Sequence, residues 1–332
     1  MKENEGPLIS VVIPVYNVEN YVRKTLDSVF AQTYKNIEVI CVNDGSTDNS
    51  LAVLQDYAKT HKITIIDQQN GGLSHARNEG FKLVKGEWVS FLDSDDYIAP
   101  DLYEKYVKAI NPDIDLLCCW IQCVQEEKST EPIPWFDHYS KILSTNCAGI
   151  KPCDTHYARE AKDQVGNKLY RSSIIRDNAI DFPKGLFSQD TAFHWKYIAF
   201  CRNIYFVPSK DFFYLLRSNT ITWNMYKRRD RAGHTIAVAK DICYFYKDKG
   251  LVQKHQKRLA DLFRVLFSLE LQRSEPENYD SLFKQASEII DRTGFTSLTY
   301  YLKAIKEGNI DKLRKGPVWK RILRAVKKLF SR

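Results

Sequence analysis

The first 120 residues alternate between strand-like apolar runs and helix-like segments, and this alternation constrains the fold more than any other feature. Residues 8–15 form a nearly continuous β-branched run, and residues 21–32 then carry apolar side chains at helical spacing. Similar apolar runs follow at 37–42, 63–66, 88–92 and 114–118. Apolar strands that alternate with helices are typical of a parallel sheet covered on both faces. The sequence therefore predicts an α/β fold with a doubly wound sheet.

The patterning changes further along the chain. It weakens after about residue 125, returns over 164–217 with two aromatic runs, and becomes almost entirely helical from Tyr226 onward. We therefore predict a domain over 1–225, with halves at 8–120 and 121–225, and a helical C-terminal region over 226–332.

Composition excludes several classes of protein. The chain has 332 residues, of which 44% are hydrophobic and 27% charged, as in globular proteins. No apolar run approaches the ~20 residues of a membrane-spanning helix, and the N-terminus lacks the pattern of a secretory signal. A zinc site of Cys147, Cys153 and His156 can be drawn, but its spacing fits no standard pattern. The eight scattered cysteines are therefore expected to be reduced thiols in a cytoplasmic protein.

The positive charge is concentrated at the C-terminus. Formal net charge is +8, yet residues 312–332 hold nine basic residues and no acidic one, which leaves the body near −1. This distribution argues against a nucleic-acid partner. Residues 319–332 also place Trp319, Phe330 and other apolar side chains at helical spacing between the basic ones. Such a helix suits peripheral contact with the inner face of the cell membrane, or it packs its apolar stripe on the protein body.

Polar turns follow four of the predicted strands. Ligands of open parallel sheets bind beyond the carboxyl ends of the strands, so these turns are expected to meet at one site. The four turns are residues 14–17, 43–48, 70–72 and 93–96.

The fourth turn carries three carboxylates within four residues, at Asp93, Asp95 and Asp96. Like charges this close raise one another's pKa unless a cation neutralises them. Mg²⁺ or Mn²⁺, held by one or two carboxylates and phosphate oxygens, would do so. Alternatively, Asp96 caps the next helix and the others accept backbone hydrogen bonds in a turn. The chain also lacks a P-loop and a dinucleotide-binding G-x-G-x-x-G after the first strand, so a bound diphosphate would depend on the metal.

Four motifs follow one another in the first 100 residues: ISVVIPVYN at 9–17, VNDGSTDNS at 42–50, NGGLSHARNEG at 70–80 and GEWVSFLDSDDYI at 86–98. Through these motifs, residues 8–106 resemble the nucleotide-sugar-binding half of a family 2 glycosyltransferase, an enzyme of the GT-A fold, which has a mixed sheet. Residues 167–171 and 185–191 resemble the acceptor-binding half of the same family, so the likeness covers about two-thirds of the chain.

This resemblance implies roles for individual residues at the donor site. Asp44 would accept a hydrogen bond from the imide N–H of a nucleobase such as uracil, and Asn43 stands where many relatives have another aspartate. Arg77 and Asn78 would lie near the diphosphate and the sugar, although Arg77 also suits a solvated helix face. The nucleobase would be held by Pro14, Val15, Tyr16 and Asn17. The DxD motif would be Asp93, Ser94 and Asp95, with Asp93 and Asp95 as metal ligands.

The resemblance also implies that Asp190 is the catalytic base. Relatives usually carry Glu-Asp at this point, whereas this chain has Gln189, so Asp190 is the only carboxylate of the pair. Inversion at an anomeric carbon needs one carboxylate to deprotonate the acceptor hydroxyl. The alternative is that Asp190 only caps a helix over 191–200.

Together these features predict an inverting, metal-dependent glycosyltransferase. It would move a sugar from a nucleotide-diphospho-sugar, preferably a UDP-sugar, to a glycan or lipid-linked acceptor in surface polysaccharide synthesis. A sugar-nucleotide pyrophosphorylase is a second hypothesis, but the chain lacks the Gly-rich basic loop that such enzymes need after the first strand. A non-catalytic member of the fold is a third, for which Gln189 leaves room.

Overall fold

The computed structural model describes residues 6–126, 136–217, 233–273 and 276–294, together with 302 and 306. The chain divides into two compact units. The first comprises residues 1–185 and 200–223, and the second comprises residues 186–199 and 224–332.

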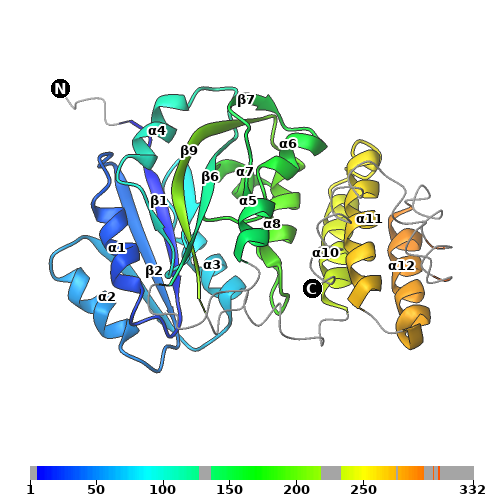
Figure 1. Cartoon of the computed structure of the whole chain (residues 1–332), viewed down its shortest axis with the longest axis horizontal. Coiled ribbons are helices and arrows are strands. Elements are labelled where there is room, and N and C mark those ends of the chain that lie inside the picture. Colours follow the sequence, from blue (N-terminus) through cyan, green and yellow to red (C-terminus); the bar gives the residue numbers. More distant parts are fainter. Residues whose placement is uncertain are drawn as a thin grey trace. The chain divides into compact units, whose positions relative to one another are not determined.

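A mixed sheet of nine strands forms the first unit within the described residues (Figure 1). The strand order is β3-β2-β1-β4-β8-β6-β9-β5, and β7 pairs with β9. The strands are β1 (Ile9–Val15), β2 (Ile37–Asp44), β3 (Ile63–Gln68), β4 (Trp88–Phe91), β5 (Tyr97–Ile98), β6 (Leu116–Gln125), β7 (Gly149–Pro152), β8 (Lys168–Arg171) and β9 (Asn203–Leu216).

Six strands of this sheet run in the same direction. β1 is parallel to β2 and β4, and β2 is parallel to β3. β8 is antiparallel to both β4 and β6, so β6 and its parallel neighbour β9 regain the direction of β1. The carboxyl ends of β1, β2, β3, β4, β6 and β9 therefore share one edge of the sheet. This mostly parallel arrangement confirms the predicted α/β class.

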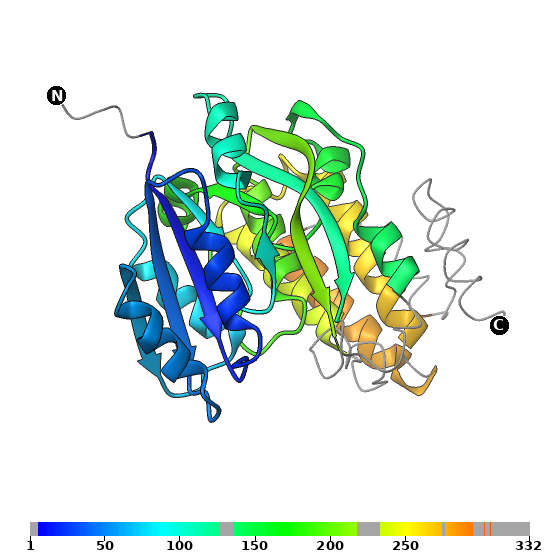
Figure 2. The ribbon, with the colours of Figure 1, turned by 60° about the vertical axis from the view of Figure 1, so that its left-hand side comes forward.

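Helices cover both faces of the sheet (Figure 1). Side chains of β1 point alternately to the two faces and therefore contact helices on both. Ile13 packs in a core cluster with Leu26 of α1, whereas Val12 faces Gly80 of α3. A Cβ on Gly80 would lie 2.5 Å from Val12 Cγ1, so glycine lets α3 approach the sheet closely. Figure 2 shows α1 lying along the other side of the strands. The helices of this unit are α1 (Val22–Phe30), α2 (Ser50–Ala58), α3 (Leu73–Lys82), α4 (Leu102–Ala109), α5 (Phe136–Leu143), α6 (Thr155–Glu160) and α7 (Ser172–Asp177).

The described part of the second unit is helical. Helix α8 is buried along most of its length, and other helices of the unit bind the carbonyls of its last turn. Tyr246 donates its hydroxyl to Trp195 O at 2.7 Å, and Arg258 donates to Ile198 O at 2.9 Å. The elements are α8 (Gln189–Ile198), α10 (His234–Asp248), α11 (Gln256–Arg273), the short 3-10 helix η1 (Pro276–Asn278) and α12 (Tyr279–Thr293).

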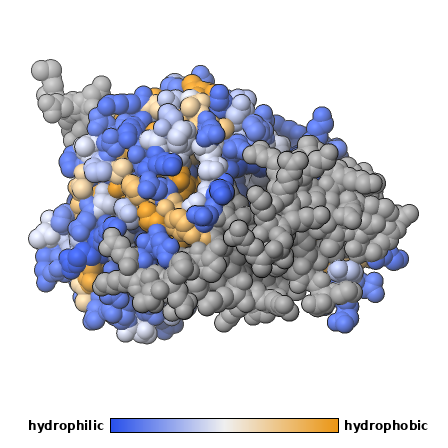
Figure 3. Space-filling view, viewed as in Figure 1, coloured by the Kyte–Doolittle hydropathy of each residue, from blue (hydrophilic) through white to orange (hydrophobic). Residues whose placement is uncertain are grey.

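On the face shown in Figure 3, the described residues are largely polar, with an apolar patch on the first unit. Among the described helices, none combines the length and the apolar character that crossing a bilayer requires. The basic segment 312–332, for which we predicted membrane contact, lies outside the described residues.

The pairing of β2 with β3 explains why Asn43 stands where the resemblance leads us to expect an aspartate. Asn43 lies opposite Asp67 in the parallel register and donates from Nδ2 to Asp67 Oδ1 at 2.7 Å. The Asn43 side chain is almost fully buried. An amide is favoured here because an aspartate would place a second carboxylate against Asp67.

We therefore expect Asn43→Asp to lower the free energy of unfolding by about 1–2 kcal/mol at pH 7. Repulsion and burial would raise the pKa of the new carboxyl, so the destabilisation should fade as the pH falls to about 4. Urea unfolding at both pH values measures this. Adding Asp67→Asn should restore stability, and an Asn43→Asp variant as stable as wild type would contradict the explanation.

A second prediction concerns His255, which lies just before α11. Burial, together with the charges of Arg258 and Lys254, lowers its pKa to about 4. The unfolded chain therefore takes up a proton near pH 6.5 that the folded chain resists until about pH 4, so stability should decline as the pH falls through this window. The urea midpoint of His255→Gln should decline less over the same window. Equal declines in both proteins would rule out this role for His255.

Candidate functional site

The turns after β1 and β2 are joined by hydrogen bonds at the carboxyl edge of the sheet. The Asn17 amide donates to Ser46 Oγ at 3.2 Å, and Asn17 Oδ1 accepts from the Thr47 amide at 2.8 Å. Asn17 has φ 51°, in the left-handed region that asparagine tolerates better than most residues. Next to it, Tyr16 is 49% exposed, whereas Pro14 and Val15 are buried. The predicted nucleobase-binding turn thus offers one open aromatic ring on a rigid support.

Asp44 connects the turn after β2 to the loop after β3. Its Oδ1 accepts from Gln68 Nε2 at 2.7 Å and from the Gly71 amide at 2.9 Å. Its Oδ2 accepts from the Gly72 amide at 2.8 Å. The loops pack so closely that a Cβ on Gly45, which has φ +71°, would lie 2.8 Å from the Asn70 nitrogen. Asp44 therefore orders the third turn, and Oδ2 keeps a lone pair beyond its one bond within the described residues.

Arg77 and Asn78 lie on α3 and contact protein groups. The Arg77 side chain is fully buried, pairs with Asp93 Oδ1 through Nη2 at 2.5 Å and lies over the ring of Phe182. Asn78 donates to Phe182 O at 2.8 Å and accepts from the Phe182 amide at 2.9 Å. Of the two environments considered for Arg77, the solvated helix face is therefore wrong. Contact of either residue with a donor stays a prediction.

The three aspartates after β4 lie together, and each has a protein partner. Asp93 binds Arg77, and Asp95 Oδ2 accepts from Arg217 Nη2 at 2.9 Å and Nε at 3.2 Å. Asp96 Oδ1 accepts from the Leu215 amide at 2.9 Å. The intervening Ser94 is buried. Among the described residues, two guanidinium groups thus face three carboxylates, one positive charge fewer than the negative charges of the cluster when all three are ionised.

The donor chemistry of this cluster fits a hard divalent cation. Burial raises the pKa of Asp95 against the opposing charge of Arg217, and the charge of Asp93 raises it further. Burial also raises the pKa of Asp96, with Asp95 and Asp93 adding to the effect. A cation would relieve this cost of ionisation, and oxygen ligands are those that Mg²⁺ and Mn²⁺ prefer. The described residues contain no group of three or more acidic, cysteine or histidine side chains gathered as a metal site, so water and substrate oxygens would complete the coordination.

Three residues that the sequence analysis did not select belong to this environment. The Arg217 guanidinium lies over the ring of Tyr21, 4.3 Å from its centroid. Tyr21 donates its hydroxyl to Glu126 Oε1 at 2.6 Å. Arg217 directly follows β9, and Glu126 directly follows β6. Ligands bind beyond the carboxyl ends of parallel strands, so this rule also indicates these two residues once the direction of both strands is known.

Asp190 lies in the second unit, in the first turn of α8, and is half-buried. Residue Ser188, with φ 57°, precedes the helix as its N-cap. Asp190 is therefore inside the helix rather than its cap, and the predicted capping role is wrong. Its neighbour Gln189 is buried.

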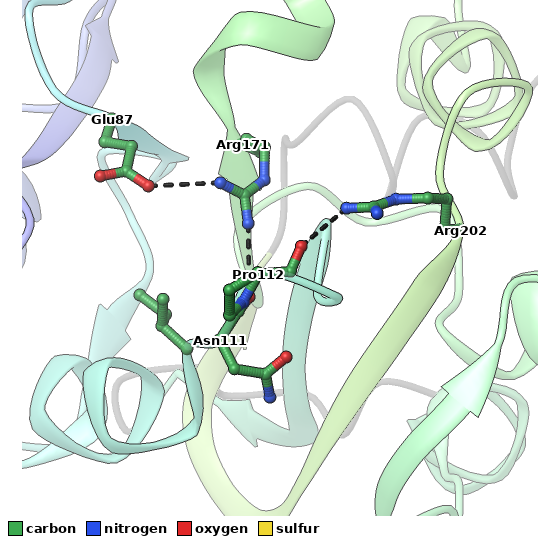
Figure 4. Close-up of a pocket in the computed structure, with 6 residues that line it drawn as sticks. Glu87, Asn111, Pro112, Arg171 and Arg202 are labelled. Carbon is green, nitrogen blue, oxygen red and sulfur yellow. Dashed lines mark hydrogen bonds and ion pairs between the residues drawn. The ribbon is translucent and has the colours of Figure 1, made fainter.

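A cavity of about 510 Å³ lies at the opposite edge of the sheet (Figure 4). Its arginines bind the loop after α4: Arg171 donates to Ile114 O at 2.6 Å, and Arg202 donates to Pro112 O at 2.7 Å. Both also pair with the buried Asp115. These bonds serve to hold the starts of β6 and β9 together, so we assign this cavity a structural role. It is lined by Glu87, Ile110, Asn111, Pro112, Arg171 and Arg202.

Comparison with known proteins gives consistent results. The family model described as Glycosyl transferase family 2 matches residues 10–162. The putative glycosyltransferase EpsH of Bacillus subtilis is 30% identical over 276 residues, covering 80% of this chain and 76% of EpsH. The hyaluronan synthase of Pasteurella multocida is 40% identical over 118 residues, which are 35% of this chain and 12% of the synthase.

The fold is similar to that of S. aureus TarS 1-349, which was solved in complex with UDP-GlcNAc. The TM-score is 0.71 at 20% identity, and the match covers 98% of this chain and 93% of the TarS chain. This likeness confirms the predicted GT-A fold. Because EpsH aligns with four-fifths of the chain and the family motifs lie at one edge of such a sheet, the chain belongs to glycosyltransferase family 2 and is a glycosyltransferase.

Proposed function

We propose that this glycosyltransferase is inverting and metal-dependent and that its donor is a UDP-sugar. The observation that carries the proposal is the cluster of Asp93, Asp95 and Asp96 at the carboxyl end of β4, which faces only two arginines within the part of the chain that the structure describes. The turns around Asn17 and Asp44 follow neighbouring strands on the same edge. A nucleotide and a cation-bound diphosphate are the ligands that such an edge suits.

The uridine would bind through the first two turns. The exposed ring of Tyr16 would contact the base, with Pro14, Val15 and Asn17 forming the rest of the turn. The free lone pair of Asp44 Oδ2 would accept from the imide N–H of uracil. TarS, whose fold is similar, was solved with UDP and with UDP-GlcNAc, which supports a uridine nucleotide.

Asp93 and Asp95 would hold Mn²⁺ or Mg²⁺, with Ser94 between them in the turn. When bound, the cation supplies charge neutralisation for the departing UDP. Arg77 would act here by fixing Asp93 Oδ1, and Asn78 by holding the backbone of Phe182. Both residues would thereby hold in place the groups that surround the diphosphate.

Asp190 would be the catalytic base. It would take the proton of the acceptor hydroxyl as that oxygen bonds to the anomeric carbon, while the bond from this carbon to the phosphate oxygen of UDP breaks. Attack opposite the leaving group inverts the anomeric configuration. The start of α8 favours this ionised carboxylate, because the helix N-terminus is positive.

The acceptor would be a growing glycan or a lipid-linked saccharide in surface polysaccharide synthesis. The relationship to a hyaluronan synthase supports a polysaccharide product. Peripheral membrane contact through residues 312–332 would suit a lipid-linked acceptor and is supported by the sequence pattern alone.

The experiment that tests donor class and metal together is calorimetry with UDP-GlcNAc, UDP-Glc, UDP-Gal and UDP-GalNAc, with Mn²⁺ and with EDTA. We expect one donor to bind with Mn²⁺ and to lose binding in EDTA, and Asp95→Asn to weaken binding by about 10- to 100-fold. Glu87→Gln at the opposite edge is the control. Donor binding that is unaffected by EDTA would refute the metal dependence.

A separate prediction concerns the base. Asp190→Asn should lower the rate of sugar transfer by about 10²- to 10⁴-fold while leaving donor affinity unchanged, because only proton removal is lost. The control variant Gln189→Asn changes the neighbouring side chain without touching the carboxylate. An unchanged transfer rate in Asp190→Asn would show that another group is the base.

A further inference from the structure

Asp95 has a counter-ion supplied by the chain itself. Arg217 directs two nitrogens, Nη2 at 2.9 Å and Nε at 3.2 Å, to the single oxygen Oδ2. The side chain of Asp95 is 22% exposed and that of Arg217 is 15% exposed. The ion pair is thus partly sheltered and still reachable from solvent.

Arg217 also contacts an aromatic ring. The ring of Tyr21, just before α1, lies against its guanidinium, and the Tyr21 hydroxyl is bonded to Glu126. The Glu126 amide donates to Leu216 O at 3.1 Å, so a hydrogen bond joins the ends of β6 and β9 at the residue before Arg217. The arginine therefore has an aromatic surface and a carboxylate nearby that do not depend on Asp95.

The arginine on Asp93 is held differently. Arg77 belongs to α3 and is fully buried, so moving it would disrupt the packing of the helix on the sheet. Arg217 follows the last residue of β9, and its side chain is 15% exposed. Of the two described guanidinium groups on the acidic cluster, Arg217 is therefore the more accessible to a ligand.

We propose that Arg217 is a positioning residue that occupies the place of the cation at Asp95, and that a divalent cation binds this carboxylate in competition with it. A cation on Oδ2 would stand within a few ångströms of the guanidinium, and the two positive charges would repel each other. The displaced guanidinium stays on the Tyr21 ring beside Glu126. In the cation-free protein the ion pair orients Asp95. This inference rests on the proposed function, because it takes Asp95 as a metal ligand.

The test is Mn²⁺ binding without donor, measured by calorimetry and by the electron paramagnetic resonance signal of free Mn²⁺. Arg217→Gln should bind Mn²⁺ about fivefold more tightly than wild type, because no guanidinium has to be displaced. Arg217→Lys keeps the charge but has a single nitrogen, so its affinity should lie between the two. Arg202→Gln, which removes an arginine paired with Asp115 at the opposite edge, should leave Mn²⁺ affinity unchanged.

A double-mutant cycle separates competition from a general effect on the fold. In an Asp95→Asn background the gain from Arg217→Gln should disappear, because the shared carboxylate is gone. Thermal unfolding of each variant shows whether it is folded. If Arg217→Gln does not fold, the Mn²⁺ affinity of Arg217→Lys is compared with that of wild type instead. A gain that persists without Asp95 would overturn the proposed competition.

The two proposals fail in different ways. If wild type and both Arg217 variants bind Mn²⁺ equally, or the variants bind it more weakly, Arg217 does not compete and only this inference falls. If Mn²⁺ binds neither wild type nor the Arg217 variants, the metal site in the proposed function is wrong, and this inference falls with it.

Discussion

The candidate site depends on the balance of charge around three aspartates that directly follow β4. Carboxylates this close can all ionise only if positive charge is brought to them. The fold brings two arginines, one from the buried face of α3 and one from the end of β9. The third partner is a backbone amide of β9. Parts of the chain more than 100 residues apart thus meet at the acidic turn and neutralise part of its charge.

The same edge of the sheet shows how a buried carboxylate can order loops. Asp44 binds the loop after β3 through two backbone amides and the Gln68 side chain. Asn17 joins the loops after β1 and β2 in a comparable way. Because the loops are bound to one another, a ligand would meet a surface that is already formed, which lowers the entropic cost of binding.

Charge balance also explains a departure from the family pattern. The resemblance leads us to expect an aspartate where this chain has Asn43, and the residue opposite in the register is Asp67. An amide donor at position 43 turns what would be a repulsive pair into a hydrogen bond. The change at Gln189 has no comparable explanation in the described contacts.

The sequence by itself determined the fold class, the family and the four turns at the carboxyl edge. Apolar periodicity and turn composition are local properties that a single chain segment carries, and the family motifs lie within such segments. The partners Arg217, Tyr21 and Glu126 were not predicted, because β8 reverses direction between β4 and β6 and only the assembled sheet shows where β6 and β9 end. The sequence also left the environment of Arg77 open. Its burial against Asp93 and Phe182 was decided by tertiary packing, since charge and helical position alone suit a solvated surface equally well.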